Sequence, residues 1–137
     1  MGTDNVTVYK VVRKDANGRY ASWGVTGDDG FWRVFYDIGA KALPLLKDSY
    51  LYAFASCDDA ERFLSTNTDA DTLPDCAILQ CKASVVGTTP YMCVIQGGIK
   101  SFWRKYKKCG GCPYGYGIHA PQGTLWCTSI TPQVVVE

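Results

Sequence analysis

The sequence predicts a single compact α+β domain in which a mostly antiparallel, curved sheet packs on one short helix at about residues 57–65. The 137 residues are 47% apolar and 20% charged, which suits one hydrophobic core. Several β-branched, alternating stretches are separated by Gly, Asn and Asp turns, a pattern typical of strands. One stretch alone combines the start signals and the apolar spacing of a helix. We expect residues 1–5 to be a flexible N-terminus and residues 6–137 to form the domain.

The N-terminal part predicts three consecutive antiparallel strands, at residues 6–13, 20–25 and 31–36. Asn17-Gly18 lies between the first two and readily adopts the positive φ angles of a tight hairpin turn. The sequence DDG at residues 28–30 predicts the second turn. Residues 38–49 contain Gly39 and Pro44 and predict an irregular crossing segment. From this segment we expect three leucines to dock on the core, namely Leu43, Leu45 and Leu46.

Residues 51–64, LYAFASCDDAERFL, predict a short buried strand that runs directly into the helix. Ser56 is a good N-cap, because its hydroxyl accepts from an otherwise unpaired N–H of the first turn. Acidic residues in that turn interact favourably with the positive end of the helix dipole. Ala60, Phe63 and Leu64 follow at the spacing of one apolar stripe. The spacing of Asp58 and Arg62 predicts an ion pair on the helix surface.

The C-terminal half predicts further strands around a Gly-rich and Pro-rich loop. Residues 76–86 alternate, which places one set of side chains on a buried face: Ala77, Leu79, Cys81, Ala83 and Val85. Residues 91–95 predict another strand, and residues 99–108 fit either a short helix or an edge strand. Residues 109–122 predict a long loop. The last main strand is expected at residues 124–131 and should end at Pro132, since proline lacks the N–H that a ladder needs.

Composition restricts the location and the partners of the protein. A formal net charge of +1 argues against a generally basic nucleic-acid binder. No apolar run approaches the roughly 20 residues of a membrane helix, and the first residues lack the pattern of a signal peptide. We therefore expect an intracellular protein with no membrane partner. Its seven cysteines are then best read as reduced thiols, with a metal site and disulfides as alternatives.

Residues 99–108, IKSFWRKYKK, concentrate five cations among three aromatic residues, so the remaining chain carries a formal −4. Cations contact phosphates and aromatic rings stack on nucleotide bases. We therefore predict that a basic aromatic segment binds an anionic small molecule or an acidic protein surface, with nucleic acid less favoured. The alternative is a solvated edge whose lysines deter aggregation. The predicted ligand-binding residues are Phe102, Trp103, Arg104, Lys105, Tyr106 and Lys107.

Cys109 and Cys112 form a CxxC, the spacing by which two thiolates hold one zinc ion. Zinc is thus the one cofactor that the sequence suggests, although a second ligand pair is missing at standard spacing. Structural thiols and a redox pair are the alternatives; a redox CxxC normally begins a helix, whereas Pro113 and several glycines follow here. His119 is the only histidine. A thiol enzyme would therefore have to pair Cys112 with His119, and we assign no catalytic residue.

The order of several short motifs resembles a loosely defined group of small uncharacterised proteins from phages and large DNA viruses. The motifs are YKVVR at residues 9–13, FASCDDAERF at 54–63, FW at 102–103 and APQGT at 120–124. The resemblance implies a compact α+β domain and, for a viral protein, the host cytoplasm, without any established activity. Residues 54–63 also resemble ADP-ribosyltransferase-like folds. Those enzymes use a glutamate on a strand, and no predicted strand here offers one.

These observations predict binding rather than catalysis, in an accessory protein that uses the basic aromatic segment. Two other classes remain open. One is an enzyme, either nucleotide-directed or thiol-dependent. The other is a structural or assembly protein whose aromatic surface is buried between copies of the chain in a homo-oligomer.

Overall fold

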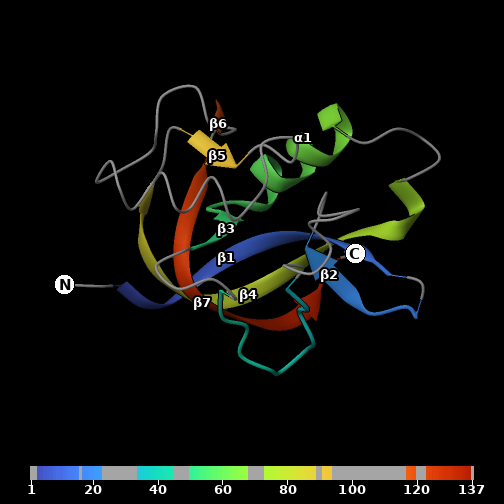
Figure 1. The fold of residues 1–137 in the computed structure, drawn as a ribbon, viewed down its shortest axis with the longest axis horizontal. Coiled ribbons are helices and arrows are strands. Elements are labelled where there is room, and N and C mark those ends of the chain that lie inside the picture. The colour runs from blue at the N-terminus through green and yellow to red at the C-terminus, as the bar shows by residue number, and fades with distance from the viewer. Residues whose placement is uncertain are drawn as a thin grey trace.

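The computed structural model describes residues 3–15, 17–22, 34–44, 50–67, 73–88, 91–93, 117–119 and 123–136. Along these residues the elements are β1 (Thr3–Lys14), β2 (Tyr20–Ser22), β3 (Leu51–Phe54), α1 (Cys57–Asn67), the short 3-10 helix η2 (Leu73–Asp75), β4 (Cys76–Thr88), β5 (Tyr91–Cys93), β6 (Gly117–His119) and β7 (Thr124–Val135). The predicted class is confirmed: an antiparallel sheet packs on one α-helix (Figure 1).

The five-stranded sheet curls until it closes. Its order is β2-β1-β3-β7-β4, and β4 pairs with β1 as well, so that β1, β3, β7 and β4 form a ring with β2 beside it. The β1–β4 and β4–β7 ladders are long, whereas β1 and β3 share the single pair Tyr9↔Phe54. We refer to this weakly paired place, where Lys10 on β1 faces Tyr52 on β3, as the β1–β3 seam.

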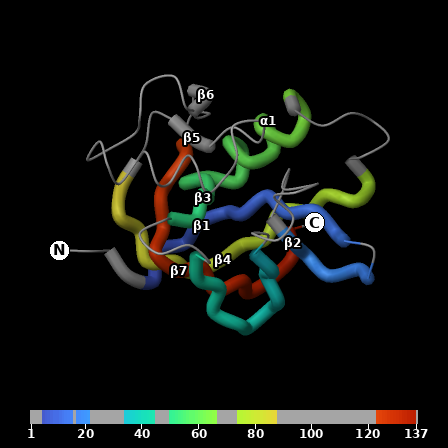
Figure 2. Tube along the Cα trace, in the orientation of Figure 1, coloured from blue at the N-terminus to red at the C-terminus, as the bar shows by residue number. Residues whose placement is uncertain are grey.

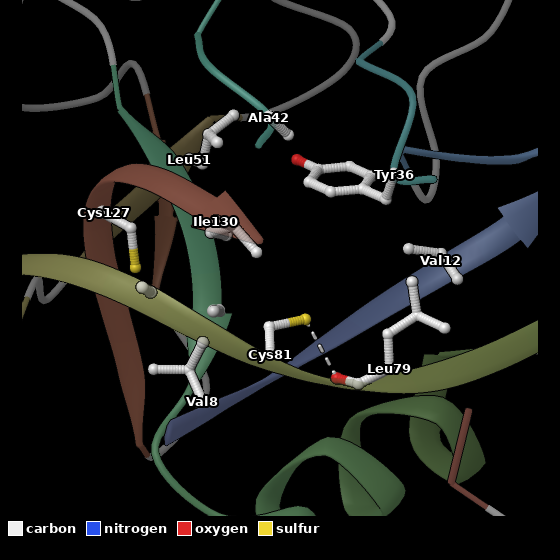
Figure 3. Packing of buried hydrophobic residues seen from close by; sticks show 11 residues of the cluster. Val8, Val12, Tyr36, Ala42, Leu51, Leu79, Cys81, Cys127 and Ile130 are labelled. Atoms are coloured by element: carbon white, nitrogen blue, oxygen red, sulfur yellow. Dashed lines mark hydrogen bonds between the residues drawn. The ribbon is translucent and has the colours of Figure 1, made fainter. Parts of the chain in front are cut away.

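The inside of the ring is the main hydrophobic core. Because side chains alternate across a strand, alternate residues of β1 and β4 point inward, whereas register shifts interrupt this alternation along β7. The alternation predicted for residues 76–86 is confirmed, since Leu79, Cys81 and Ala83 are buried here. Removing this apolar surface from water is the dominant stabilising contribution to the fold. The inward residues that are 0% exposed include Val8, Val12, Leu79, Cys81, Cys127 and Ile130 (Figure 3).

Residues 34–44 cross the sheet beside the C-terminal part of β7 (cyan in Figure 2). The Gly39 N–H donates to the Pro132 carbonyl at 2.8 Å, and Ala42 and Ile130 exchange backbone hydrogen bonds of 2.7 and 3.0 Å. Tyr36 and Ala42 are buried in the core, but Leu43 is 55% exposed. The predicted docking of Leu43 is therefore wrong, because the bridge to Ile130 turns Ala42 inward and its neighbour outward. Leu45 and Leu46 lie outside the described residues.

Helix α1 covers the opposite, outer face of the sheet (Figure 1). Its predicted stripe is confirmed, because Ala60, Phe63 and Leu64 are buried in a second cluster. Arg62 pairs with Asp59 at 3.1 Å rather than with Asp58 as predicted. A spacing of three residues also brings two side chains together on the surface of a helix. The helix continues to Asn67, two residues beyond the predicted end. The second cluster also contains Val11, Phe54 and Ile78 of the sheet.

Replacing Ser56 with alanine should lower the free energy of unfolding by about 1 kcal/mol, the usual cost of losing an N-cap. The Ser56 hydroxyl accepts from the Asp59 N–H at 3.2 Å, and alanine would leave that donor unpaired. Urea denaturation measures the change. Ser65→Ala is the matched control, because Ser65 is an exposed serine of the same helix that only donates to the Arg62 carbonyl. Equal losses in the two variants would show that the cap contributes nothing.

The ends of several strands differ from the predictions. β1 begins at Thr3, which pairs with Val85, so residues 3–5 belong to a strand. β7 continues through Pro132 to Val135. Pro132 lies opposite Cys81, where the β4–β7 register shifts, and a ladder irregularity tolerates the missing N–H of proline. The predicted loop at residues 109–122 contains the short strand β6.

The predicted N-terminal hairpin is confirmed. Gly18 has a φ of 82° and its N–H donates to the Asp15 carbonyl at 3.0 Å, which closes the turn between β1 and β2. Of the predicted third strand, Phe35 forms one antiparallel bridge with Ala21. Residues 23–33 lie outside the described part of the chain.

Candidate functional site

The predicted ligand-binding residues Phe102–Lys107 and the predicted zinc ligands Cys109 and Cys112 all lie outside the described residues. The structure does describe the two strands that this part of the chain joins. β5 and β6 pair antiparallel, with Tyr91 opposite His119 and Cys93 opposite Gly117. Residues 94–116 therefore leave the β5–β6 pair and return to it at the same place.

The β5–β6 pair follows directly from the long β4–β7 ladder. The last pair of that ladder is Thr88↔Leu125, two residues before β5 begins. At the same end of β7, Thr124 pairs with Phe54, and the Ala55 N–H donates to the Gly123 carbonyl at 2.9 Å. Thr88, which precedes β5, and Thr124, which follows β6, thus lie at the end of the main sheet where β3 leads into α1.

A second candidate site, which sequence reasoning missed, is centred on Lys10. Lys10 lies on the inner face of β1 between Val8 and Val12; both valines are 0% exposed, whereas Lys10 keeps partial exposure. Its Nζ donates to the Tyr52 carbonyl at 2.6 Å and lies 5.1 Å from the centre of the Tyr36 ring. The alternation of residues 6–13 was the available signal, because it places position 10 on the same face as positions 8 and 12.

The Lys10 side chain spans the β1–β3 seam. β1 and β3 share only the pair Tyr9↔Phe54. The hydrogen bond from the Lys10 ammonium to the Tyr52 carbonyl is a further link between these two strands. The ion pairs within the described part of the chain are Arg19–Asp37 and Arg62–Asp59, so none joins Lys10 to a carboxylate there. Burial lowers the pKa of Lys10 to about 8, and the nearby Cys127 and Cys81 thiols oppose this only in part.

The described thiols are poor nucleophiles. Burial raises the pKa of Cys81 to about 12 and that of Cys127 to about 11, and the positive charge of Lys10 offsets only part of the effect. The Cys81 thiol donates to the Leu79 carbonyl at 3.3 Å (Figure 3). Burial, followed by the charge of Glu61, also raises the pKa of Cys57. Because the thiolate is the reactive form, the raised pKa values make these three thiols less reactive than an ordinary exposed cysteine. Free thiols in the described residues are Cys57, Cys76, Cys81 and Cys127.

Two other properties can be stated for the described residues alone. No group of three or more His, Cys, Asp or Glu side chains among them is placed to hold a metal ion, and the predicted pair Cys109 and Cys112 is not among them. None of their helices has the length and apolar character needed to cross a membrane. For His119 the structure describes the backbone, which pairs with Tyr91.

Comparison with known proteins finds no matching family model, no matching curated protein and no matching solved structure. The resemblance to proteins of phages and large DNA viruses accordingly stays a prediction. The site must be interpreted from the chemistry of its own residues.

Proposed function

We propose that this chain is an intracellular binding protein that holds an anionic small molecule, or an acidic protein surface, through its basic aromatic segment. The observation that carries this proposal is the β5–β6 pair, which places Cys93 opposite Gly117, the two residues that flank 94–116. A loop with anchored ends has already lost part of its conformational freedom. Binding residues are often carried by loops that a rigid scaffold positions in this way.

The composition of the segment suits an anion. Arg104, Lys105 and Lys107 supply cations within four residues, and Trp103 directly before them and Tyr106 among them supply aromatic faces. Arginine binds phosphate and carboxylate groups with two parallel hydrogen bonds, whereas lysine acts as a point charge. Since the chain outside residues 99–108 is formally negative, this segment is where the sequence concentrates its positive charge.

The described thiols favour binding over thiol chemistry. A thiol enzyme needs a cysteine whose pKa is lowered by a neighbouring base or cation. Cys57, Cys81 and Cys127 instead have raised pKa values. A thiol-dependent mechanism would therefore have to use another cysteine of the chain.

The proposal predicts that the triple variant Arg104→Ala/Lys105→Ala/Lys107→Ala binds heparin and ATP at least about tenfold more weakly than the wild type, since each lost phosphate contact removes a released counterion. Heparin tests for a polyanion surface and ATP for a small anion with a stacking base. Equilibrium titration at two salt concentrations measures both affinities, and the salt dependence should become shallower in the variant.

The matched control removes the same charge from exposed positions elsewhere: Lys14→Ala/Lys41→Ala/Arg62→Ala. It should change either affinity by no more than about twofold, because general electrostatic attraction is screened within about 10 Å. Equal losses of affinity in the two triple variants would show that only the net charge matters, and would overturn the proposal. Failure of the wild type to bind either probe would also count against an anion site.

A further inference from the structure

We propose that the Lys10 amine is an attachment site for small, uncharged aldehydes, which it captures as an imine at the β1–β3 seam. This inference does not depend on the function proposed above. The inference rests on where the fold places an amine: on the inner face of a closed sheet, among apolar residues, at the one place where the ring is held by a single residue pair.

The surroundings of Lys10 make its ammonium ion easier to deprotonate than that of an exposed lysine. Val8 and Val12 flank it along β1, and Leu79 lies opposite on β4; all three are 0% exposed. The described groups that favour the charged form are weaker than a carboxylate: the Tyr52 carbonyl accepts one hydrogen bond, and the Tyr36 ring provides a cation–π contact. Desolvation is the usual way in which proteins make a lysine nucleophilic.

The chemistry balances without any oxidant or reductant. The lone pair of the neutral Lys10 amine adds to the carbonyl carbon of the aldehyde. The carbonyl oxygen then leaves as water, taking up the two hydrogens that the amine nitrogen loses, and a carbon–nitrogen double bond remains. We expect an uncharged aldehyde, because a carboxylate or phosphate on the ligand would lose its hydration at the apolar inner face, which costs free energy.

The route to the amine is the β1–β3 seam, where the two strands share one residue pair. Val8 and Val12, its neighbours on the inner face, are fully buried, whereas Lys10 retains part of its surface. The Tyr52 hydrogen bond holds the nitrogen at the seam rather than deep in the core. Lys10 is therefore part-exposed as a residue while its amine is buried, so a small electrophile has to enter between β1 and β3 to reach the nitrogen.

The test is reductive alkylation of the native full-length chain with propanal and cyanoborohydride at pH 8, followed by peptide mass spectrometry. Cyanoborohydride delivers hydride to the imine carbon and makes the adduct permanent. At that pH a lysine with a pKa near 8 is about half neutral, against less than about one percent for an ordinary lysine. We expect Lys10 to react at least about tenfold faster than Lys14, an exposed lysine of the same strand.

Four further measurements make the result decisive. The rate at Lys10 should level off above about pH 9, and in urea its advantage over Lys14 should disappear. Lys10→Arg keeps the cation and should abolish the adduct. Glyoxylate, an anionic aldehyde, should label Lys10 more slowly than propanal does. The proposal is overturned if native Lys10 reacts no faster than Lys14, or if it reacts only after unfolding. Faster labelling by glyoxylate would overturn the assignment of an uncharged ligand.

Discussion

Gly123→Ala is expected to lower the free energy of unfolding by about 3 kcal/mol or more. Gly123 has a φ of 84°, a region that costs an L-residue roughly 1–2 kcal/mol. A Cβ at this position would also overlap the Asp59 carboxylate and would lie 2.8 Å from its Cγ. Overpacking of this kind typically adds about 1–3 kcal/mol. Urea denaturation followed by circular dichroism measures the loss.

The contact matters because Gly123 and Asp59 join the start of β7 to the start of α1. The Gly123 carbonyl accepts from the Ala55 N–H, and Asp59 both donates its N–H to Ser56 and pairs with Arg62. Moving Asp59 away from an added Cβ would therefore disturb the cap and the ion pair together.

Gly39→Ala is the matched control, because Gly39 has the same φ of 84° but nothing within 4 Å of an added Cβ. Gly39→Ala should cost about 1–2 kcal/mol, the conformational part alone. The double variant Gly123→Ala/Asp59→Ala should recover part of the loss, since it removes the overlapping carboxylate. If Gly123→Ala costs no more than Gly39→Ala, the close approach to Asp59 has no energetic consequence.

The second large effect is a pH dependence of stability that Lys10 controls. Burial places the folded-state pKa of Lys10 at about 8, against about 10.4 for an unfolded lysine. Below pH 8 both states carry the charge, and the folded state bears its full desolvation cost. Between about pH 8 and 10.5 the folded state loses this proton first, so the cost disappears and stability rises. The lysine contribution should thus become more favourable by about 3 kcal/mol over this range.

The measurement compares the wild type with Lys10→Met in urea denaturation at pH 7 and pH 10.5. The difference in the free energy of unfolding between the two proteins is needed, because the buried thiols change the stability with pH in the opposite direction. The pKa values of Cys81 and Cys127 are raised by burial, so above about pH 9 the unfolded state releases these protons first and stability falls. The free energy of unfolding of the wild type should increase relative to that of Lys10→Met as the pH rises. A difference independent of pH would show that the Lys10 amine is not desolvated.

Much of the local structure was predictable because the signals are local. The capped start of α1 follows from Ser56 and the acidic residues after it, and its buried stripe follows from three apolar residues at helical spacing. The alternation of residues 76–86 likewise placed Leu79 and Cys81 on the buried face. In each case the deciding interactions lie within a few residues, so the chain need not be folded for them to be recognised.

The candidate sites show where this kind of reasoning ends. The basic aromatic segment was recognisable because its charges and rings are adjacent in sequence, although it lies outside the described residues. Lys10 was missed because a lysine in a strand is usually assigned to a solvated face. Its burial depends on β4 and β3 closing around β1, and no residue near Lys10 in the sequence indicates that closure.

By itself, then, the sequence determined the fold class, the helix and the hairpin at Gly18, all through contacts between near neighbours. Tertiary structure alone decided that the sheet closes, that β7 continues through Pro132, and that Ala42 rather than Leu43 enters the core. The physical reason is that pairing between distant strands sets which face of each strand is enclosed. Shifting a strand by one residue exchanges its two faces, and only the assembled ring selects between them.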